Sequence, residues 1–282
     1  MCRLSCKPVP KLDTSHGISI CMWNINGALT GKSKCNKLND PAFLKTVQGQ
    51  DIIALVETHV SPHVTLEIEG YWTFRIDRPQ SKNARHFGGL AIFIKNELRK
   101  TNIKIVQQSL DYVWLKIDKT NINLDENIFM CIAYVPPSNS EYLAKLGIDV
   151  LAQIQNDIMK YNKIGQIVLT GDFNARTGTN LDFIENDSDI GLINTGYIAD
   201  QQIIQRKNQD NVVNARGKEL LELCISSRIR ILNGRTVGDT LGYHTCHKWN
   251  GSSAVDYAAV SENLISSKKK FVISKSIIIY AI

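Results

Sequence analysis

The feature that most constrains the fold is a series of short runs rich in isoleucine and valine, separated by polar stretches with helical periodicity. Several of these runs are apolar throughout, without alternating polar positions, which indicates strands buried on both faces. Residues 18–23, 52–56, 90–94, 112–117, 128–135, 164–170 and 254–260 are therefore expected to be strands, and residues 41–48, 141–161 and 215–227 to be helices. Strands and helices mixed in this way predict an α/β protein whose sheets are covered by helices.

Composition allows a single large soluble domain. The chain has 282 residues, of which 43% are hydrophobic, and a formal net charge of +6, which suits a polyanionic partner without identifying one. The cysteines are scattered and follow no zinc-binding spacing, so we expect reduced thiols and an intracellular protein. Residues 1–16 predict a loose lead-in and residues 17–282 the folded domain, with no segment that binds or spans a membrane.

Polar side chains follow five of the apolar runs, at the point where a strand gives way to a loop. In chain order they are Asn24, Glu57, Tyr134, Asp172 with Asn174, and Asp256. Rigid strands that present polar groups at one rim are a common way to build a site.

The chemistry of these residues is that of a hard-cation phosphate site. Glu57, Asp172 and Asp256 are carboxylates, and Asn24 and Asn174 carry amides. Magnesium binds through a few such oxygens and keeps water and phosphate oxygens as its other ligands, whereas a soft metal would need clustered Cys or His. Phosphodiester hydrolysis also needs an activated water and stabilised phosphoryl oxygens, which these groups supply without a covalent nucleophile.

Each residue taken singly has a simpler interpretation. A Gly-Asp pair after a strand is usually a turn, and Asn26-Gly27 is typical of a hairpin turn. Glu57 on its own would be a solvated strand end, and Tyr134 a packed aromatic residue. Only the whole set in this order favours a site.

At this point the residues resemble the endonuclease/exonuclease/phosphatase superfamily, and most closely its LINE-type (non-LTR) retrotransposon endonuclease domains. The motifs that carry the resemblance are Trp23-Asn24-Ile25-Asn26-Gly27, Val56-Glu57-Thr58, Ala133-Tyr134-Val135-Pro136, Leu169-Thr170-Gly171-Asp172-Phe173-Asn174-Ala175 and Ser253-Ala254-Val255-Asp256-Tyr257. The resemblance implies a DNase I-like fold, a four-layered α/β sandwich of two facing β-sheets covered by helices. It also implies a DNA substrate.

The resemblance assigns a role to each matching residue. Glu57 would hold Mg²⁺ or Mn²⁺ with Asn24 beside it, and Asp172 would deprotonate the attacking water. Asn174 would position phosphate and water, and Tyr134 would bond a phosphoryl oxygen. Asp256 would orient a catalytic histidine.

Contacts with DNA are expected in two places. By position in the family's hairpin, the resemblance points to Thr245, Ser253 and Val255. From the residues themselves, Arg176 follows the Gly-Asp-Phe-Asn motif and is placed to meet a phosphate, and Trp249 could stack on bases. The lysine runs at 95–100 and 268–270 are more typical of solvated surface.

The sequence departs from the family pattern at its end. The family's Ser-Asp-His motif would begin where this chain stops at Ala281-Ile282, and none of the histidines follows a Ser-Asp pair. We therefore expect either a fragment followed by a reverse transcriptase or a degenerate relic, with slow or absent DNA cleavage. A phosphatase or phosphodiesterase of the same superfamily acting on lipid or inositol phosphates, and a catalytically dead binding module, remain the alternatives.

Overall fold

The computed structural model describes residues 17–30, 35–79, 86–101, 103–122, 124–184, 203–249, 251–265, 271–274 and 277–281. The predicted lead-in at 1–16 and the lysine run at 268–270 lie outside the described residues. Within the described residues, no helix is long and apolar enough to cross a membrane.

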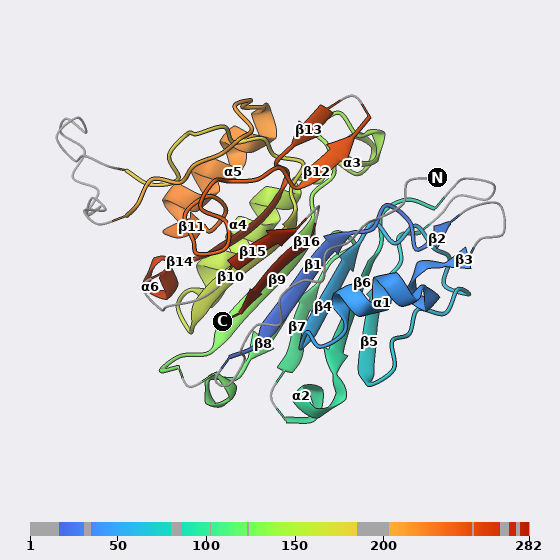
Figure 1. Ribbon diagram of the computed structural model, residues 1–282. Coiled ribbons are helices and arrows are strands. Elements are labelled where there is room, and N and C mark those ends of the chain that lie inside the picture. Colours follow the sequence, from blue (N-terminus) through green and yellow to red (C-terminus); the bar gives the residue numbers. More distant parts are fainter. Residues whose placement is uncertain are drawn as a thin grey trace.

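Two six-stranded sheets form the centre of the molecule (Figure 1). The first runs in the order β15 (Phe271–Ser274), β16 (Ile277–Ala281), β1 (Ser19–Asn24), β4 (Ile52–Val56), β6 (Leu90–Lys95) and β5 (Tyr71–Ile76). The second runs in the order β11 (Ile229–Ile231), β14 (Asp256–Ser261), β10 (Gln166–Asp172), β9 (Ile128–Tyr134), β8 (Tyr112–Ile117) and β7 (Ile103–Gln108).

The alternating faces of the central strands explain how the layers form. In β4, Ile52, Ala54 and Val56 pack between the sheets, and Ile53 and Leu55 pack outward beneath helix α1 (Pro41–Val47). Successive strand residues point to opposite faces, so a continuous apolar run buries both of them. β4 is buried at every position.

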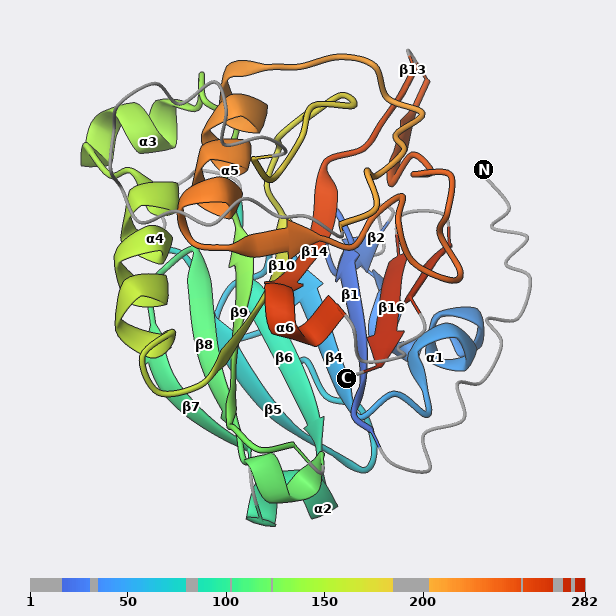
Figure 2. The same cartoon turned by 90° about the vertical axis from the view of Figure 1, so that its left-hand side faces the viewer.

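Helices cover the outer face of the second sheet as well. Helices α4 (Val150–Tyr161) and α5 (Ala215–Ser226) place Ile154, Ile158 and Leu220 in one cluster with Leu169 of β10. Figure 2 shows α1 and α4 on opposite sides of the two sheets. The predicted α/β sandwich of two facing sheets covered by helices is confirmed.

The helix predicted over residues 141–161 is two helices, and the prediction of one was wrong. Helix α3 (Glu141–Leu146) ends at Gly147, whose φ of 61° is left-handed, and Asp149 caps α4 by accepting a hydrogen bond from the Ala152 amide at 3.2 Å. Glycine in this conformation is a common helix terminator. Leu146, the last residue of α3, is exposed.

Several boundaries also differ from the prediction. The strand expected from Ile164 begins at Gln166 and continues through Asp172, and the strand expected from Ala254 begins at Asp256. The shorter elements are two hairpins, β2 (Leu29–Thr30) with β3 (Cys35–Asn36) and β12 (Cys246–Lys248) with β13 (Gly251–Ser253); helices α2 (Asn96–Thr101) and α6 (Glu262–Ile265); and 3₁₀ helices at Lys37–Asn39 and Lys119–Asn121.

Gly171 is required by a close approach of two strands. It has φ +150°, and a Cβ atom built there would lie 1.9 Å from the carbonyl oxygen of Ala133 in β9. A side chain would therefore push β9 and β10 apart just beside Asp172.

We predict that Gly171→Ala lowers the free energy of unfolding by about 3 kcal/mol, from overpacking and backbone strain together. Gly147→Ala is the matched control, since Gly147 has φ +61° and a Cβ atom added there would have no neighbour within 4 Å. It should lose only about 1 kcal/mol, the cost of the left-handed conformation. Urea denaturation of both variants measures the difference, and equal losses would contradict the close approach.

Candidate active site

Three of the predicted site residues lie side by side on neighbouring strands of the second sheet. Asp172 pairs with Tyr134 across the parallel β9–β10 ladder and with Asp256 across the antiparallel β10–β14 ladder. The hydrogen-bonding register of the sheet thus aligns a phenol and two carboxylates at one rim.

Asn24 and Glu57 reach the same rim from the first sheet. Asn24 is the last residue of β1, and its register partner Val56 ends β4, directly before Glu57. The Asn24 side-chain nitrogen donates to Glu57 Oε2 at 2.8 Å and to Asp172 Oδ2 at 2.7 Å. One amide therefore links two carboxylates that belong to different sheets.

The loop after β4 holds Glu57 in an unusual backbone conformation. Glu57 has φ 55° and His59 has φ 53°. Backbone bonds fix the loop on both sides, from the Gly27 amide to the Glu57 carbonyl at 2.7 Å and from the His59 amide to the Gly88 carbonyl at 2.9 Å. Left-handed non-glycine residues held in this way are characteristic of functional sites.

The carboxylates of the site differ in acidity. Burial raises the pKa of Asp172 to about 6 and the Glu57 charge adds to the rise, although hydrogen bonds from the Asn174 amide and from Asn24 oppose it. Burial acts in the same direction on Glu57, but interactions with His59, Tyr134 and Asn24 outweigh it and lower the pKa of Glu57 to about 2. Burial, together with the charges of Glu57 and Asp172, raises the pKa of Tyr134 and keeps the phenol protonated.

Asp256 is a buried carboxyl group with an unused oxygen. Its Oδ1 has no hydrogen-bond partner among the described residues. Burial, and then the charge of Asp172, raises the pKa of Asp256 well above its ordinary value. Its backbone is fixed by Thr245, whose Oγ1 accepts hydrogen bonds from the amides of Val255 and Asp256 at 3.1 and 3.0 Å.

Asn174 lies beside Asp172 in a left-handed turn with φ 48°. Its backbone amide donates to Asp172 Oδ1 at 2.9 Å, and its side-chain amide donates to the Val135 carbonyl at 3.0 Å. The structure thus brings Asn24, Glu57, Tyr134, Asp172, Asn174 and Asp256 to one rim.

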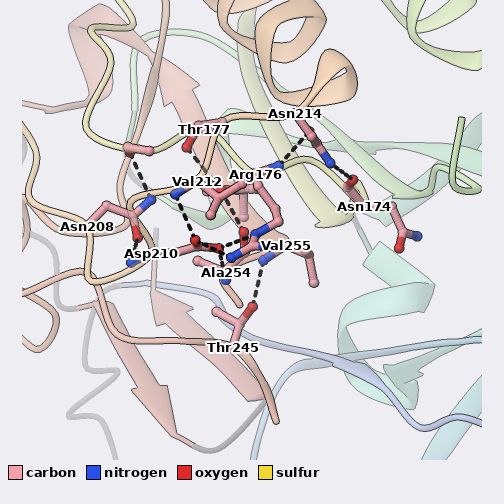
Figure 3. Close-up of polar contacts among 12 residues, drawn as sticks. Asn174, Arg176, Thr177, Asn208, Asp210, Val212, Asn214, Thr245, Ala254 and Val255 are labelled. Carbon is pink, nitrogen blue, oxygen red and sulfur yellow. Dashed lines mark hydrogen bonds and ion pairs between the residues drawn. The ribbon is translucent and has the colours of Figure 1, made fainter. Parts of the chain in front are cut away.

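Arg176 is engaged by a partner that the sequence did not indicate. Its Nε and Nη2 donate to Asp210 at 2.8 and 2.6 Å, and the same carboxylate accepts from the backbone amides of Val212 and Ala254 (Figure 3). The Arg176 side chain is 32% exposed. Arg176 and Asp210 therefore tie the loop after β10 to the segment before Asp256, and a phosphate contact by Arg176 stays a prediction.

The remaining predicted DNA contacts lie on or beside the β12–β13 hairpin. Trp249 is 98% exposed, whereas Thr245, at the base of the hairpin, is fully buried. Ser253, which pairs with Cys246, and Val255 are both partly buried.

Sequence reasoning missed two residues that belong to the site. His59 places its Nε2 3.6 Å from Glu57 Oε1. Asp210 binds Arg176 from a distant loop. The spacing of two residues from Glu57 could have pointed to His59, but nothing in the sequence around Asp210 marks it.

A divalent cation fits the donor set of this rim. Among the described residues, no group of three or more His, Cys, Asp and Glu side chains is arranged to hold a metal on its own. Magnesium needs fewer protein ligands than that, since it retains waters and phosphate oxygens. Burial, with a smaller contribution from the mutual repulsion of Glu57, Asp172 and Asp256, raises the pKa values of both aspartates, and a cation would relieve that repulsion.

We predict that Arg176→Ala lowers the free energy of unfolding by about 2–3 kcal/mol. The change leaves a buried carboxylate without its cation, and the figure is reduced from that of a fully buried pair because Arg176 is partly exposed. Chemical denaturation tests this, with Lys218→Ala at an exposed position as the control. A different outcome would show that Arg176 contacts a phosphate. In that case stability would be unchanged, and the slope of log DNA affinity against log salt concentration would fall in magnitude by about one.

We predict a pH dependence of stability that comes from Asp172. Its pKa is about 6 in the folded protein, above the ordinary value of 3.8, so folding disfavours the charged form. Stability should therefore fall as pH rises from about 4 to about 6. The asparagine variant Asp172→Asn lacks this titration. Its free energy of unfolding, taken relative to that of the parent, should therefore rise by about 3 kcal/mol between pH 4 and pH 7. Denaturation curves at both pH values check this, and a constant difference would contradict it.

Comparisons with known proteins agree with this fold. The family model described as "Endonuclease/Exonuclease/phosphatase family" matches residues 23–274. The structure is similar to that of the AP endonuclease LMAP from Leishmania major, at 15% identity and a TM-score of 0.60 over 96% of this chain and 88% of that one. It is similar to the Xenopus laevis APE2 catalytic domain, at 14% identity and a TM-score of 0.62 over 94% and 91%.

The endonuclease domain of TRAS1, a telomere-specific non-LTR retrotransposon, also has this fold, at 12% identity and a TM-score of 0.53 over 94% of this chain and 98% of that one. No curated protein matches the chain significantly. From the extent of the family match and the two-sheet fold, the chain belongs to the endonuclease/exonuclease/phosphatase family.

Proposed function

We propose that this protein is a magnesium- or manganese-dependent phosphodiesterase that nicks DNA. The observation that carries the proposal is the Asn24 amide, which donates to Glu57 at 2.8 Å and to Asp172 at 2.7 Å. It supports a single pocket in which a cation-binding carboxylate and a general base face one phosphate.

The protonation state of each residue suits it to a different role in hydrolysis. Asp172, with a pKa of about 6, is suited to accept a proton from the attacking water near neutral pH. Tyr134 stays protonated and can donate to a phosphoryl oxygen, and Asn174 would help to orient the water. Glu57, ionised at neutral pH, would hold the cation with Asn24 beside it. When bound, the cation would stabilise the charge that develops on the phosphoryl oxygens.

DNA is the substrate class that the surface features favour. The β12–β13 hairpin carries Trp249 almost fully exposed, as suits a base-stacking side chain, and the chain has a net charge of +6. Structurally similar proteins include AP endonucleases and the TRAS1 endonuclease domain. The similarity to the TRAS1 domain and the resemblance of the sequence motifs to LINE-type retrotransposon endonucleases support derivation from a retrotransposon, where a reverse transcriptase would be the partner domain.

We expect cleavage by residues 1–282 to be slow. Asp256 would orient a histidine, yet no histidine among the described residues bonds to it and its Oδ1 is without a partner there. A positioned acid–base group contributes about 100- to 10,000-fold in rate.

A plasmid-nicking assay with long incubation tests the proposal. The parent should nick supercoiled DNA slowly with Mg²⁺ or Mn²⁺ and not at all with a chelator. Glu57→Gln and Asp172→Asn should each reduce the remaining rate at least about 100-fold, because each removes a charge that the reaction uses. Glu222→Gln, an exposed carboxylate on α5, is the matched control and should nick like the parent.

The proposal would be contradicted if nicking continued in the presence of the chelator, or if neither Glu57→Gln nor Asp172→Asn reduced its rate. Salt-sensitive DNA binding without any nicking would favour the binding-module alternative. Release of phosphate from inositol phosphates, without DNA binding, would favour the phosphatase alternative.

A further inference from the structure

We propose that His59 is a nitrogen ligand of the cation held by Glu57, so that the site binds Mn²⁺ in preference to Mg²⁺. The inference rests on the proposed cation site and concerns which ion that site selects. Mg²⁺ is bound almost entirely through oxygen ligands, whereas first-row transition-metal ions accept an imidazole nitrogen more readily.

The burial of His59 is the first observation. Its side chain is only 8% exposed, and neither ring nitrogen has a hydrogen-bond partner among the described residues. Buried polar side-chain atoms nearly always have a partner, so two unpartnered nitrogens on one ring require an explanation. A bound ion would satisfy one of them.

The distance to Glu57 is the second observation. His59 Nε2 lies 3.6 Å from Glu57 Oε1, which is too long for a good hydrogen bond. Two ligand atoms that share one cation, each about 2.0–2.2 Å from it, lie about 3–3.5 Å apart. The spacing therefore suits two ligands of one ion better than a direct bond between the two side chains.

The third observation is that the backbone holds both residues in place. The amides of Thr58 and His59 donate to the carbonyls of Gly89 and Gly88 at 3.2 and 2.9 Å. Phe87 lies edge-on to the His59 ring at 5.9 Å between ring centroids. A ligand pair fixed in this way loses little freedom when an ion binds.

An alternative role for His59 makes the opposite prediction about cation affinity. If the ring were instead a positive counter-charge for Glu57, it would compete with the ion. Removing it would then tighten cation binding, whereas removing a ligand weakens it.

The test is to titrate Mn²⁺, and separately Mg²⁺, into the metal-free protein and to measure the binding affinity by calorimetry. His59→Phe keeps a ring of similar size and removes both nitrogens, and His63→Phe, at an exposed position in the same loop, is the matched control. We expect His59→Phe to weaken Mn²⁺ binding about 10- to 100-fold and Mg²⁺ binding by less than about threefold. His63→Phe should change neither.

Pulsed electron paramagnetic resonance of the Mn²⁺-loaded parent gives a second readout that needs no variant. A directly bound imidazole should produce nitrogen modulation of the Mn²⁺ signal. Its absence in the parent, or unchanged or tighter Mn²⁺ binding in His59→Phe, would overturn the inference.

A Glu57→Gln variant separates this inference from the proposed function. If Glu57→Gln loses Mn²⁺ binding and His59→Phe does not, the role of His59 is refuted and the cation site stands. If neither change affects Mn²⁺ binding, the ion lies elsewhere and both proposals fail.

Discussion

The side-chain amide of Asn24 is the interaction on which the candidate site depends. It donates to carboxylates from two separate sheets, Glu57 after β4 and Asp172 at the end of β10. Hydrogen bonds to charged acceptors are stronger than neutral ones, and this one amide makes two. It holds together two negative groups that would otherwise repel, and so fixes how the rims of the sheets meet.

The rest of the fold serves to hold that rim still. Apolar residues of both sheets interlock between them, and helices cover both outer faces. Gly171 lets β9 and β10 approach closely, which brings Tyr134 beside Asp172. On the second sheet, Arg176 and Asp210 secure the loop after Asp172 to the segment that precedes Asp256. Burial of Asp172 and Asp256 here costs stability, a cost characteristic of sites kept for function.

Local sequence patterns predicted the strands that are buried on both faces and the polar residues at their ends. The edge strands β5 and β7 were missed because their residues are largely half-exposed or alternate with polar positions, so no apolar run marks them. The break at Gly147 was missed because the apolar periodicity continues across it. The Arg176–Asp210 pair joins residues 34 apart in the chain, and no local pattern encodes such a contact. Likewise, the sequence placed His59 near Glu57 but did not show that its ring is buried.

We propose that Glu57 holds a cation, with Asn24 beside it and with Asp172 next to it as the general base. A crystal of the protein soaked in Mn²⁺ and measured for anomalous scattering tests it most directly. An anomalous peak is expected within about 2.2 Å of a Glu57 carboxylate oxygen. A fully loaded crystal with its peak elsewhere, and none at Glu57, would contradict it.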